Sequence, residues 1–200
     1  MLKRSFPVVA AFLVFAVPAM AESWQIDKAH SSVGFTVQHL VITKVKGYFR
    51  DYDAAIEFDG KNLDQASIKA TVQMASIDTD NERRDNHLRS PDFFDVDTFP
   101  TMTFVSRKII PGEGNTFTMV GDLTIRDKTR EVTFNGQLNG IIIDPRGNTR
   151  AGLSASTTIN RQDFGVAWDN KLQDGSLVVS NDVNIQLDIE MVKEEQPTGP

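Results

Sequence analysis

Three histidines are the side chains in this chain best suited to hold a metal ion. His30, His39 and His87 are the only ones among the 200 residues, and three imidazoles suffice for an open zinc site. None stands in an HxH or HxxxH arrangement, and each falls on a different predicted strand or loop. We therefore expect no metal and no other cofactor. Instead, His30 would make a local hydrogen bond near a bulge in the first strand, and His39 would lie at a strand end.

Asp27, His30 and Ser31 are the residue types of a hydrolytic triad. Neighbouring residues of a strand point to opposite faces, so His30 and Ser31 cannot easily address one another. The sequence also lacks the GxSxG motif of a nucleophile elbow. We therefore interpret these residues as structural.

Asp92, Asp95 and Asp97 offer the paired carboxylates that a glycosidase needs across a cleft. Three acids in a short loop next to prolines are more often helix caps and turn formers. Capping is the interpretation we favour, and no residue of the chain is predicted to be catalytic.

Arg83, Arg84 and Arg89 form the one basic cluster of the chain. Guanidinium groups match the oxygens of phosphate or pyrophosphate. However, Asp80 precedes Arg84 by four residues and Asp85 precedes Arg89 by four, so on a helix these pairs would bind each other. We favour this structural interpretation.

The charge and the N-terminus restrict the function classes. Lys3 and Arg4 precede an apolar run from Phe6 to Val17, and Ala19-Met20-Ala21 supplies a small-x-small cleavage site. Residues 1–21 are therefore predicted to be a signal peptide, too short and too broken for a permanent membrane span. The remaining chain has 19 basic and 27 acidic residues and no cysteine. We expect a periplasmic protein without nucleic-acid binding, stable membrane insertion or disulfides.

Alternating apolar and polar residues dominate the body of the chain and indicate half-buried strands. Eight strands are counted, with turn formers such as Asp59-Gly60 and Asp144-Pro145 between them. The stretches Ser23–His39 and Lys44–Phe58 are long enough to favour a closed antiparallel barrel over a sandwich. One domain is expected over residues 22–193, followed by a flexible tail over residues 194–200.

Two long segments interrupt the strands. Asp78–Pro100 is predicted to contain one or two short helices, with Asp80 or Asn81 as N-cap, and Arg161–Ser180 is a second long loop. The inward strand faces mix large side chains with small ones such as Gly121 and Gly136. These glycines either leave room for a ligand or allow strands to coil, and the composition leaves both readings open.

The order of motifs resembles the YceI-like family of bacterial periplasmic proteins. The segment RRDNHLRSPDFFDVDTFP is the most specific match, and it lies within a longer matching stretch at Ser76–Ser106. The other matching segments cover nearly all of the chain after the signal; they are Trp24–Leu40, Val45–Asp59, Val120–Phe134 and Ile159–Val166.

The resemblance implies an all-β fold, an extended lipocalin-like eight-stranded antiparallel barrel with short helices in the long loops. Its apolar interior would hold a polyisoprenoid or another long-chain lipid. Strand alternation then assigns candidate ligand contacts on the cavity wall to Phe35, Val37, Val72, Met74, Phe104, Met119 and Phe134, and on the covering loops to Phe93, Phe94, Phe164 and Trp168.

The favoured function is thus that of a non-enzymatic carrier. Two other functions remain open: an isoprenoid-modifying enzyme that uses polar groups of Asp78–Pro100, and a stress-related or redox-related module that binds an envelope protein through its outer face. A homodimer also remains open.

Overall fold

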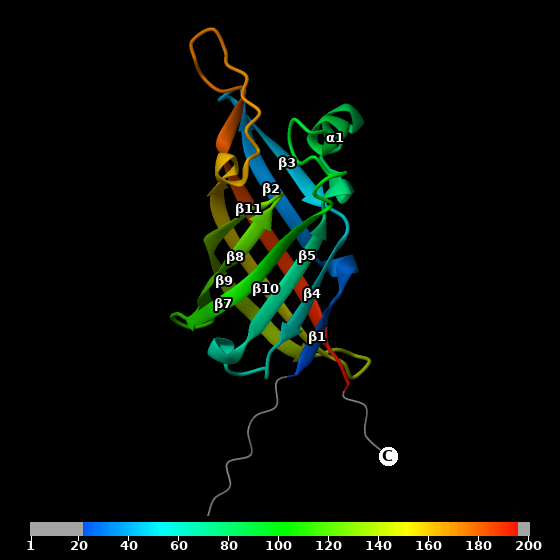
Figure 1. Ribbon diagram of the computed structural model, residues 1–200. Helices are drawn as coiled ribbons and strands as arrows, with labels where there is room; N and C mark the ends of the chain where they lie inside the picture. Colours follow the sequence, from blue (N-terminus) through cyan, green and yellow to red (C-terminus); the bar gives the residue numbers. More distant parts are fainter. Residues whose placement is uncertain (1–21, 196–200) are drawn as a thin grey trace, which may run out of the picture.

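The computed structural model describes residues 22–195 and shows an elongated antiparallel β-barrel (Figure 1). The predicted signal peptide lies outside these residues, as does most of the predicted tail. The strands are β1 (Ser23–Ile26), β2 (Ser32–His39), β3 (Thr43–Phe49), β4 (Tyr52–Glu57), β5 (Ser67–Gln73), β6 (Ile77–Asp78), β7 (Thr101–Pro111), β8 (Thr116–Ile125), β9 (Lys128–Ile143), β10 (Thr149–Asn160) and β11 (Val179–Lys193). The helices are α1 (Glu82–Arg89) and the 3-10 turns η1 (Lys28–His30), η2 (Leu63–Gln65), η3 (Met74–Ser76) and η4 (Arg161–Phe164).

Eleven strand segments build eight long strands. β1 and β2 form one interrupted strand, because both pair with β11. β3 and β4 form a second, which pairs with β2 and β1, and β5 and β6 form a third, which pairs with β4 and β3. Pairing of β1 with β11, with Trp24 opposite Lys193, closes the ring. The predicted eight-stranded lipocalin-like barrel is therefore confirmed.

The breaks within the long strands divide the barrel into two ends. β2, β3 and β6 belong to the end that carries α1, which we call the α1 end, whereas β1, β4 and β5 belong to the terminal end (Figure 1). β6 has only two residues, and the chain leaves it for α1 before it returns as β7. The segment Thr79–Pro100 thus covers the α1 end, where the sheet is less continuous.

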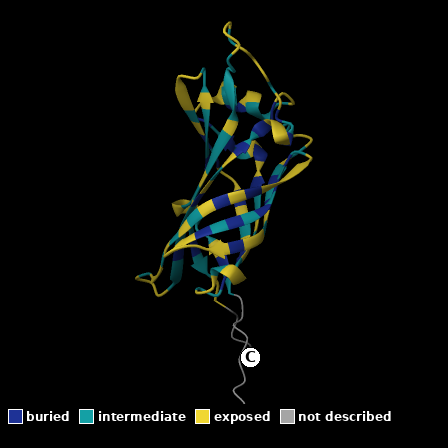
Figure 2. Cartoon of the chain, turned by 90° about the vertical axis from the view of Figure 1, so that its left-hand side faces the viewer, coloured by how far each residue is buried: buried dark blue, intermediate teal, exposed yellow. Residues whose placement is uncertain are grey.

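The terminal end is filled by side chains. Phe104 and Phe134 meet edge to face at 5.4 Å between ring centres, with Phe117 and Met119 buried beside them. Nearer the chain ends, the indole N–H of Trp24 donates to the carbonyl oxygen of Phe58 at 2.8 Å. Figure 2 shows the buried residues alternating with exposed ones along the strands of this half.

The inward glycines of the terminal end do not leave room for a ligand. A Cβ atom built at Gly136 would lie 2.5 Å from Cζ of Phe117 and 2.8 Å from the carbonyl oxygen of Ser154. The Phe104 ring covers Gly121 in the same way. Of the two readings left open by the sequence, packing of aromatic rings against bare backbone is the one that the structure shows at these positions.

The close contact at Gly121 leads to a prediction for stability. A methyl group there would lie 2.5 Å from the Phe104 ring and 2.5 Å from the carbonyl oxygen of Val105, and the backbone cannot move aside cheaply. Gly121→Ala is expected to lower the free energy of unfolding by about 2 kcal/mol. Gly152→Ala is the control, because its nearest atom is 3.8 Å away. Urea denaturation of both variants tests this, and equal unfolding midpoints would contradict it.

Helix α1 confirms part of the prediction for the first long segment. The Asn81 side chain accepts the backbone N–H of Arg84 at 2.9 Å and so caps the helix. The expected Asp80–Arg84 and Asp85–Arg89 ion pairs are wrong. Arg84 donates to the carbonyl oxygen of Thr79, Arg89 donates to the carbonyls of Ala75 and Ile77, and Asp85 turns inward to accept from Thr79. Asp80 precedes the helix and has a positive φ of 58°, so the four-residue spacing does not apply to it.

Both ends of the described chain lie together at the terminal end (Figure 1). The backbone N–H of Glu194 donates to the carbonyl oxygen of Ser23 at 2.8 Å. Within residues 22–195, no helix combines the length and apolar character required to cross a membrane.

Candidate ligand cavity

A cavity of about 250 Å³ occupies the interior of the α1 end. It exceeds the roughly 150 Å³ of an engineered cavity that binds benzene and is just below the usual range of ligand pockets, about 300–1,000 Å³. Its walls are almost wholly apolar. They come from the strands β2, β3, β7, β8, β10 and β11, from α1 and from the two long segments, and the strand contributions include Val33, Phe35, Val37, Val45, Phe49, Met102, Ile125, Ile159, Val183 and Ile185.

One wall of the cavity is formed by β2 and β11. Val37 lies opposite Val183, and Phe35 lies opposite Ile185, with all four side chains on the inner face. These residues are only partly buried although they point inward, since part of their surface faces the hollow. Phe35 leans across Gly47, where a Cβ atom would lie 2.3 Å from the ring.

A cluster of aromatic side chains, which we call the aromatic cover, lies at the α1 end of the cavity. The ring centres of Phe93 and Trp168 are 5.2 Å apart, and the His87 imidazole meets both edge to face at 4.9 and 5.7 Å. Arg126 links the two covering segments by donating to the carbonyl oxygens of Phe93 and Gly165 at 3.0 and 2.9 Å. The cover is thus built from both long segments, as the sequence predicted for Phe93 and Trp168.

Few polar groups reach the cavity. Arg84 and His87 line it and also line a hollow on the outer surface, so they lie between the interior and solvent. Thr79 also lines the cavity and, like Asp85, is buried; the Thr79 hydroxyl donates to Asp85 and accepts from Nε of Arg84 at 2.7 Å. Arg161 is the one cavity-lining arginine among the described residues that is almost fully buried, with 5% of its surface exposed.

The structure brings six of the eleven predicted contact residues to this cavity: Phe35, Val37, Phe93, Phe94, Phe164 and Trp168. Their contact with a ligand stays a prediction. The other five lie in the packed interior, outside the cavity lining; they are Val72, Met74, Phe104, Met119 and Phe134. Alternation along a strand shows which face points inward, but it does not show at which height of the barrel a residue lies, and the hollow is confined to the α1 end.

Sequence reasoning missed several lining residues. The alternating row Val183, Ile185, Leu187, Ile189 and Met191 indicates one face of a strand, but nothing in the sequence places its first two residues beside the hollow rather than in the packed part. Arg161 follows β10 in η4, where Asn160 caps the turn by accepting from the backbone N–H of Gln162. No sequence signal marks Arg161, whose neighbours Asn160, Gln162 and Asp163 are all polar.

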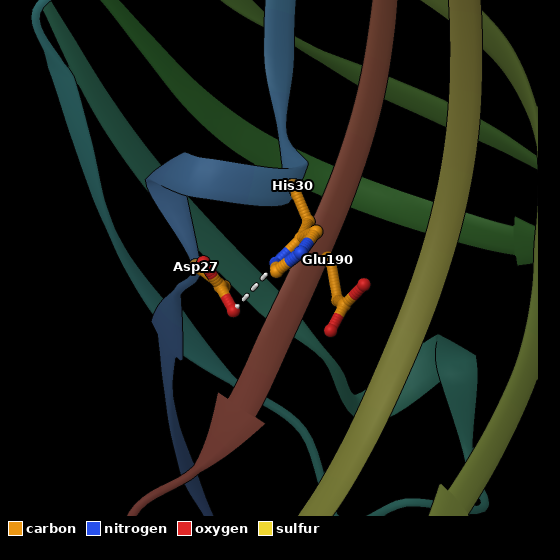
Figure 3. A group of neighbouring side chains, drawn as sticks. All are labelled: Asp27, His30 and Glu190. Carbon is orange, nitrogen blue, oxygen red and sulfur yellow. Dashed lines mark hydrogen bonds and ion pairs between the residues drawn. The ribbon is translucent and has the colours of Figure 1, made fainter.

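A second group of polar side chains lies near the terminal end. The His30 imidazole contacts Asp27 at 3.0 Å in a local hydrogen bond, as predicted, and Glu190 lies beside them (Figure 3). These three have the atom types of a metal site. However, Nη1 of Arg150 already contacts Oδ2 of Asp27 at 2.7 Å and Oε1 of Glu190 at 2.5 Å. A cation would have to displace this guanidinium, so the geometry favours an ion-pair network.

Ser31 forms hydrogen bonds with the backbone of Glu190 and none with His30, so the two side chains do not form part of a triad.

This network predicts a loss of stability in acid. The hydrogen bond from Arg150 and the contact with His30 hold the pKa of Asp27 at about 2, below the usual 3.8. A depressed folded-state pKa stabilises the protein above pH 3.8, and the contribution disappears as the pH falls through about 2. Asp27→Asn should therefore lower the free energy of unfolding by about 1 kcal/mol at pH 7, with the difference shrinking below pH 4. Denaturation curves at pH 7, 4, 3 and 2 test this, and a difference that persists at pH 2 contradicts it.

Comparisons with known proteins agree with this architecture. The family model of the YceI-like domain matches residues 24–191. A UPF0312 protein of Staphylococcus aureus (strain MSSA476) is 37% identical over 169 residues, which cover 84% of this chain and 96% of that protein. The crystal structure of the Campylobacter jejuni YceI protein shares 33% identity and a TM-score of 0.70, with 84% of this chain and 96% of that one covered.

A more distant likeness concerns the fold alone. A polyisoprenoid binding domain from Saccharophagus degradans, implicated in plant cell wall breakdown, superposes with a TM-score of 0.63 at 14% identity. The match covers 86% of this chain and 99% of that domain. The shared architecture therefore extends over the whole barrel.

Proposed function

This chain belongs to the family of YceI-like domains, and from that premise we propose that it is a non-enzymatic protein that binds the apolar part of an amphiphile inside the α1 end of its barrel. The observation that carries the proposal is the cavity of about 250 Å³ with almost wholly apolar walls. A small polar metabolite would lose its hydration there and find few partners in return.

The size of the cavity limits how much of a ligand it encloses. A methylene group is close in size to a water molecule, which takes about 30 Å³ of liquid volume, so the cavity holds on the order of ten carbon atoms. At about 0.8 kcal/mol per buried methylene, these carbons contribute roughly 8 kcal/mol before the cost of immobilising the ligand. Longer tails would extend through the opening or displace rings of the packed half.

We propose a polyisoprenoid or a similar long-chain lipid as the ligand. The fold shared with a polyisoprenoid binding domain supports this class, and branched isoprene units would suit the Val, Ile and Phe side chains of the wall. The role of carrier is part of the proposal. A soluble carrier needs an apolar interior for the tail and an outer surface that is mainly polar, and β8 and β9 alternate in this way.

The proposed binding involves no chemical step. His87, the only histidine of the α1 cover, contacts Asp92 at 2.9 Å on the exposed side and packs its ring on Phe93 and Trp168. Its contacts are those of a cover residue, and none of the acids Asp92, Asp95 or Asp97 lines the cavity.

We propose that the protein acts in the periplasm, on the basis of the predicted signal peptide at residues 1–21. Expression of the full chain in a Gram-negative host should give a periplasmic protein whose first residue is Glu22. Recovery of the full-length chain from the cytoplasmic fraction would overturn this part of the proposal.

The fluorescence of Trp168 provides a direct test of binding. Trp24 and Trp168 are the only tryptophans, and they lie at opposite ends of the barrel. In a Trp24→Phe background, farnesol should shift or quench the emission of Trp168 to a 1:1 end point. Organic extraction of protein purified from cells should also yield a stoichiometric long-chain lipid. No saturable response together with repeatedly empty extracts would overturn the proposal.

A further inference from the structure

Arg161 presents a positive charge at the wall of the apolar cavity. Its side chain is 5% exposed. Nε donates to the carbonyl oxygen of Ser180 at 3.0 Å, and Nη1 donates to that of Val166 at 2.6 Å. Nη2 donates to Oδ1 of Asn181 at 3.1 Å and, more weakly, to the carbonyl oxygen of Val179. All of these acceptors are neutral.

No carboxylate within residues 22–195 forms an ion pair with Arg161. Asp169 is the acidic group that acts on it through space, but its carboxylate contacts Lys171 at 3.8 Å. Burial lowers the pKa of Arg161, which shows that the site disfavours the charge that the side chain must carry. Buried charges in proteins are normally paired. A buried charge without a counterion destabilises the folded state, which suggests that it has a function.

The other arginines near the cavity differ from Arg161 in this respect. Arg84 is linked to the buried carboxylate of Asp85 through the hydroxyl of Thr79. Arg126 lies 3.9 Å from a carboxylate oxygen of Asp95. Arg161 thus combines deep burial, neutral partners and a position on the cavity wall.

The guanidinium of Arg161 also has donor capacity left. A guanidinium has five N–H groups, and the bonds within the described residues use four of them. The second N–H of Nη1 has no acceptor within residues 22–195, and Arg161 belongs to the cavity lining. Arginine recognises carboxylate and phosphate oxygens strongly, particularly where water is excluded.

We propose that the cavity binds amphiphiles with an anionic oxygen headgroup, either a carboxylate or a phosphate, and that Arg161 supplies the countercharge beneath the covering segment 165–178. This inference rests on the proposed function and adds the headgroup to it. The tail lies along the apolar wall of β2 and β11, and the headgroup stays near η4 with Arg84 at the edge of the same site. A neutral headgroup would leave the Arg161 charge uncompensated.

Matched ligand pairs test the inference without any change to the residues that line the cavity. The affinity for hexadecanoate should exceed that for hexadecanol by at least tenfold, and the affinity for farnesyl phosphate should exceed that for farnesol likewise, both measured through Trp168 fluorescence in the Trp24→Phe background. A preference in only one pair identifies carboxylate or phosphate as the source of the charge. If alcohols bind as tightly as anions, the inference fails while the proposed function stands; if no member of either pair binds, both fail.

Variants connect the preference to the side chain. Arg161→Gln should weaken hexadecanoate binding at least tenfold and change hexadecanol binding by less than twofold. Arg107→Gln is the matched control, because Arg107 pairs with Asp122 and Glu131 on the outer face, and it should change neither. If Arg161→Gln does not fold, Arg161→Lys, which retains the charge, should fold and keep the preference for anions. Loss of both ligands in equal measure in a folded Arg161→Gln would overturn the assignment.

Discussion

Replacing both Val37 and Val183 with phenylalanine should abolish most ligand binding while the barrel stays folded. The two valines lie opposite each other on β2 and β11, and both face the hollow. Two rings placed there would occupy the space of roughly four methylene groups of a ligand. The binding free energy lost with these groups is about 3 kcal/mol, which corresponds to a 100-fold loss of affinity. The rings would fill empty volume instead of overpacking the core, so the free energy of unfolding should change by less than about 1 kcal/mol. Farnesol and hexadecanoate titrations, with urea denaturation in parallel, measure both quantities.

The control for this pair lies on the outer face of the barrel. Val105 is 41% exposed on β7, and Val105→Phe adds the same ring outside the cavity. It should leave ligand affinity unchanged. Unaltered binding in a folded Val37→Phe/Val183→Phe protein would show that the ligand lies elsewhere and would remove the cavity as the site.

Replacing Trp168 with alanine should accelerate ligand release by about 30-fold. The indole packs against Phe93 and His87 and joins the covering segment 165–178 to the loop that follows α1. Its loss removes about 2 kcal/mol of cover contacts that must break for a ligand to leave. The association rate should change much less, because removing part of a cover does not slow entry. Stopped-flow displacement of a fluorescent fatty acid measures both rates.

Trp24→Phe is the matched control for Trp168→Ala. Trp24 is buried at the terminal end and donates to the carbonyl oxygen of Phe58. Its replacement should cost about 1 kcal/mol of stability through the lost hydrogen bond and leave ligand release unchanged. If the two variants released ligand at the same rate, the aromatic cover would have no role in retention.

The architecture of this protein could be predicted from its sequence because apolar and polar residues alternate along the strands with a period of two. The long stretches Ser23–His39 and Lys44–Phe58 indicated bent barrel strands, and the structure resolves each into two segments joined by a break. The helix in Asp78–Pro100 was predictable from its cap at Asn81. These features depend on local backbone geometry and on which face of a strand is apolar, and both are encoded within a few residues.

The position of the cavity could not be predicted in the same way. Phe35 and Phe134 have the same alternation signal, yet one lines the hollow and the other fills the core. Their difference depends on the shear of the barrel and on where α1 interrupts the sheet, which are long-range properties. The ion pairs expected for Arg84 and Arg89 failed for a related reason, because the backbone carbonyls they bind belong to the chain before the helix.

The two ends of the described chain and the cavity lie at opposite poles of the molecule. A fluorescent reporter, an affinity tag or a tether to a solid support added at either end of the described chain would therefore lie at the pole remote from the cavity. Immobilised protein should bind and release the proposed ligand with unchanged capacity. Given the proposed function, this geometry suits the barrel to use as a surface-attached sensor or extraction medium for amphiphiles.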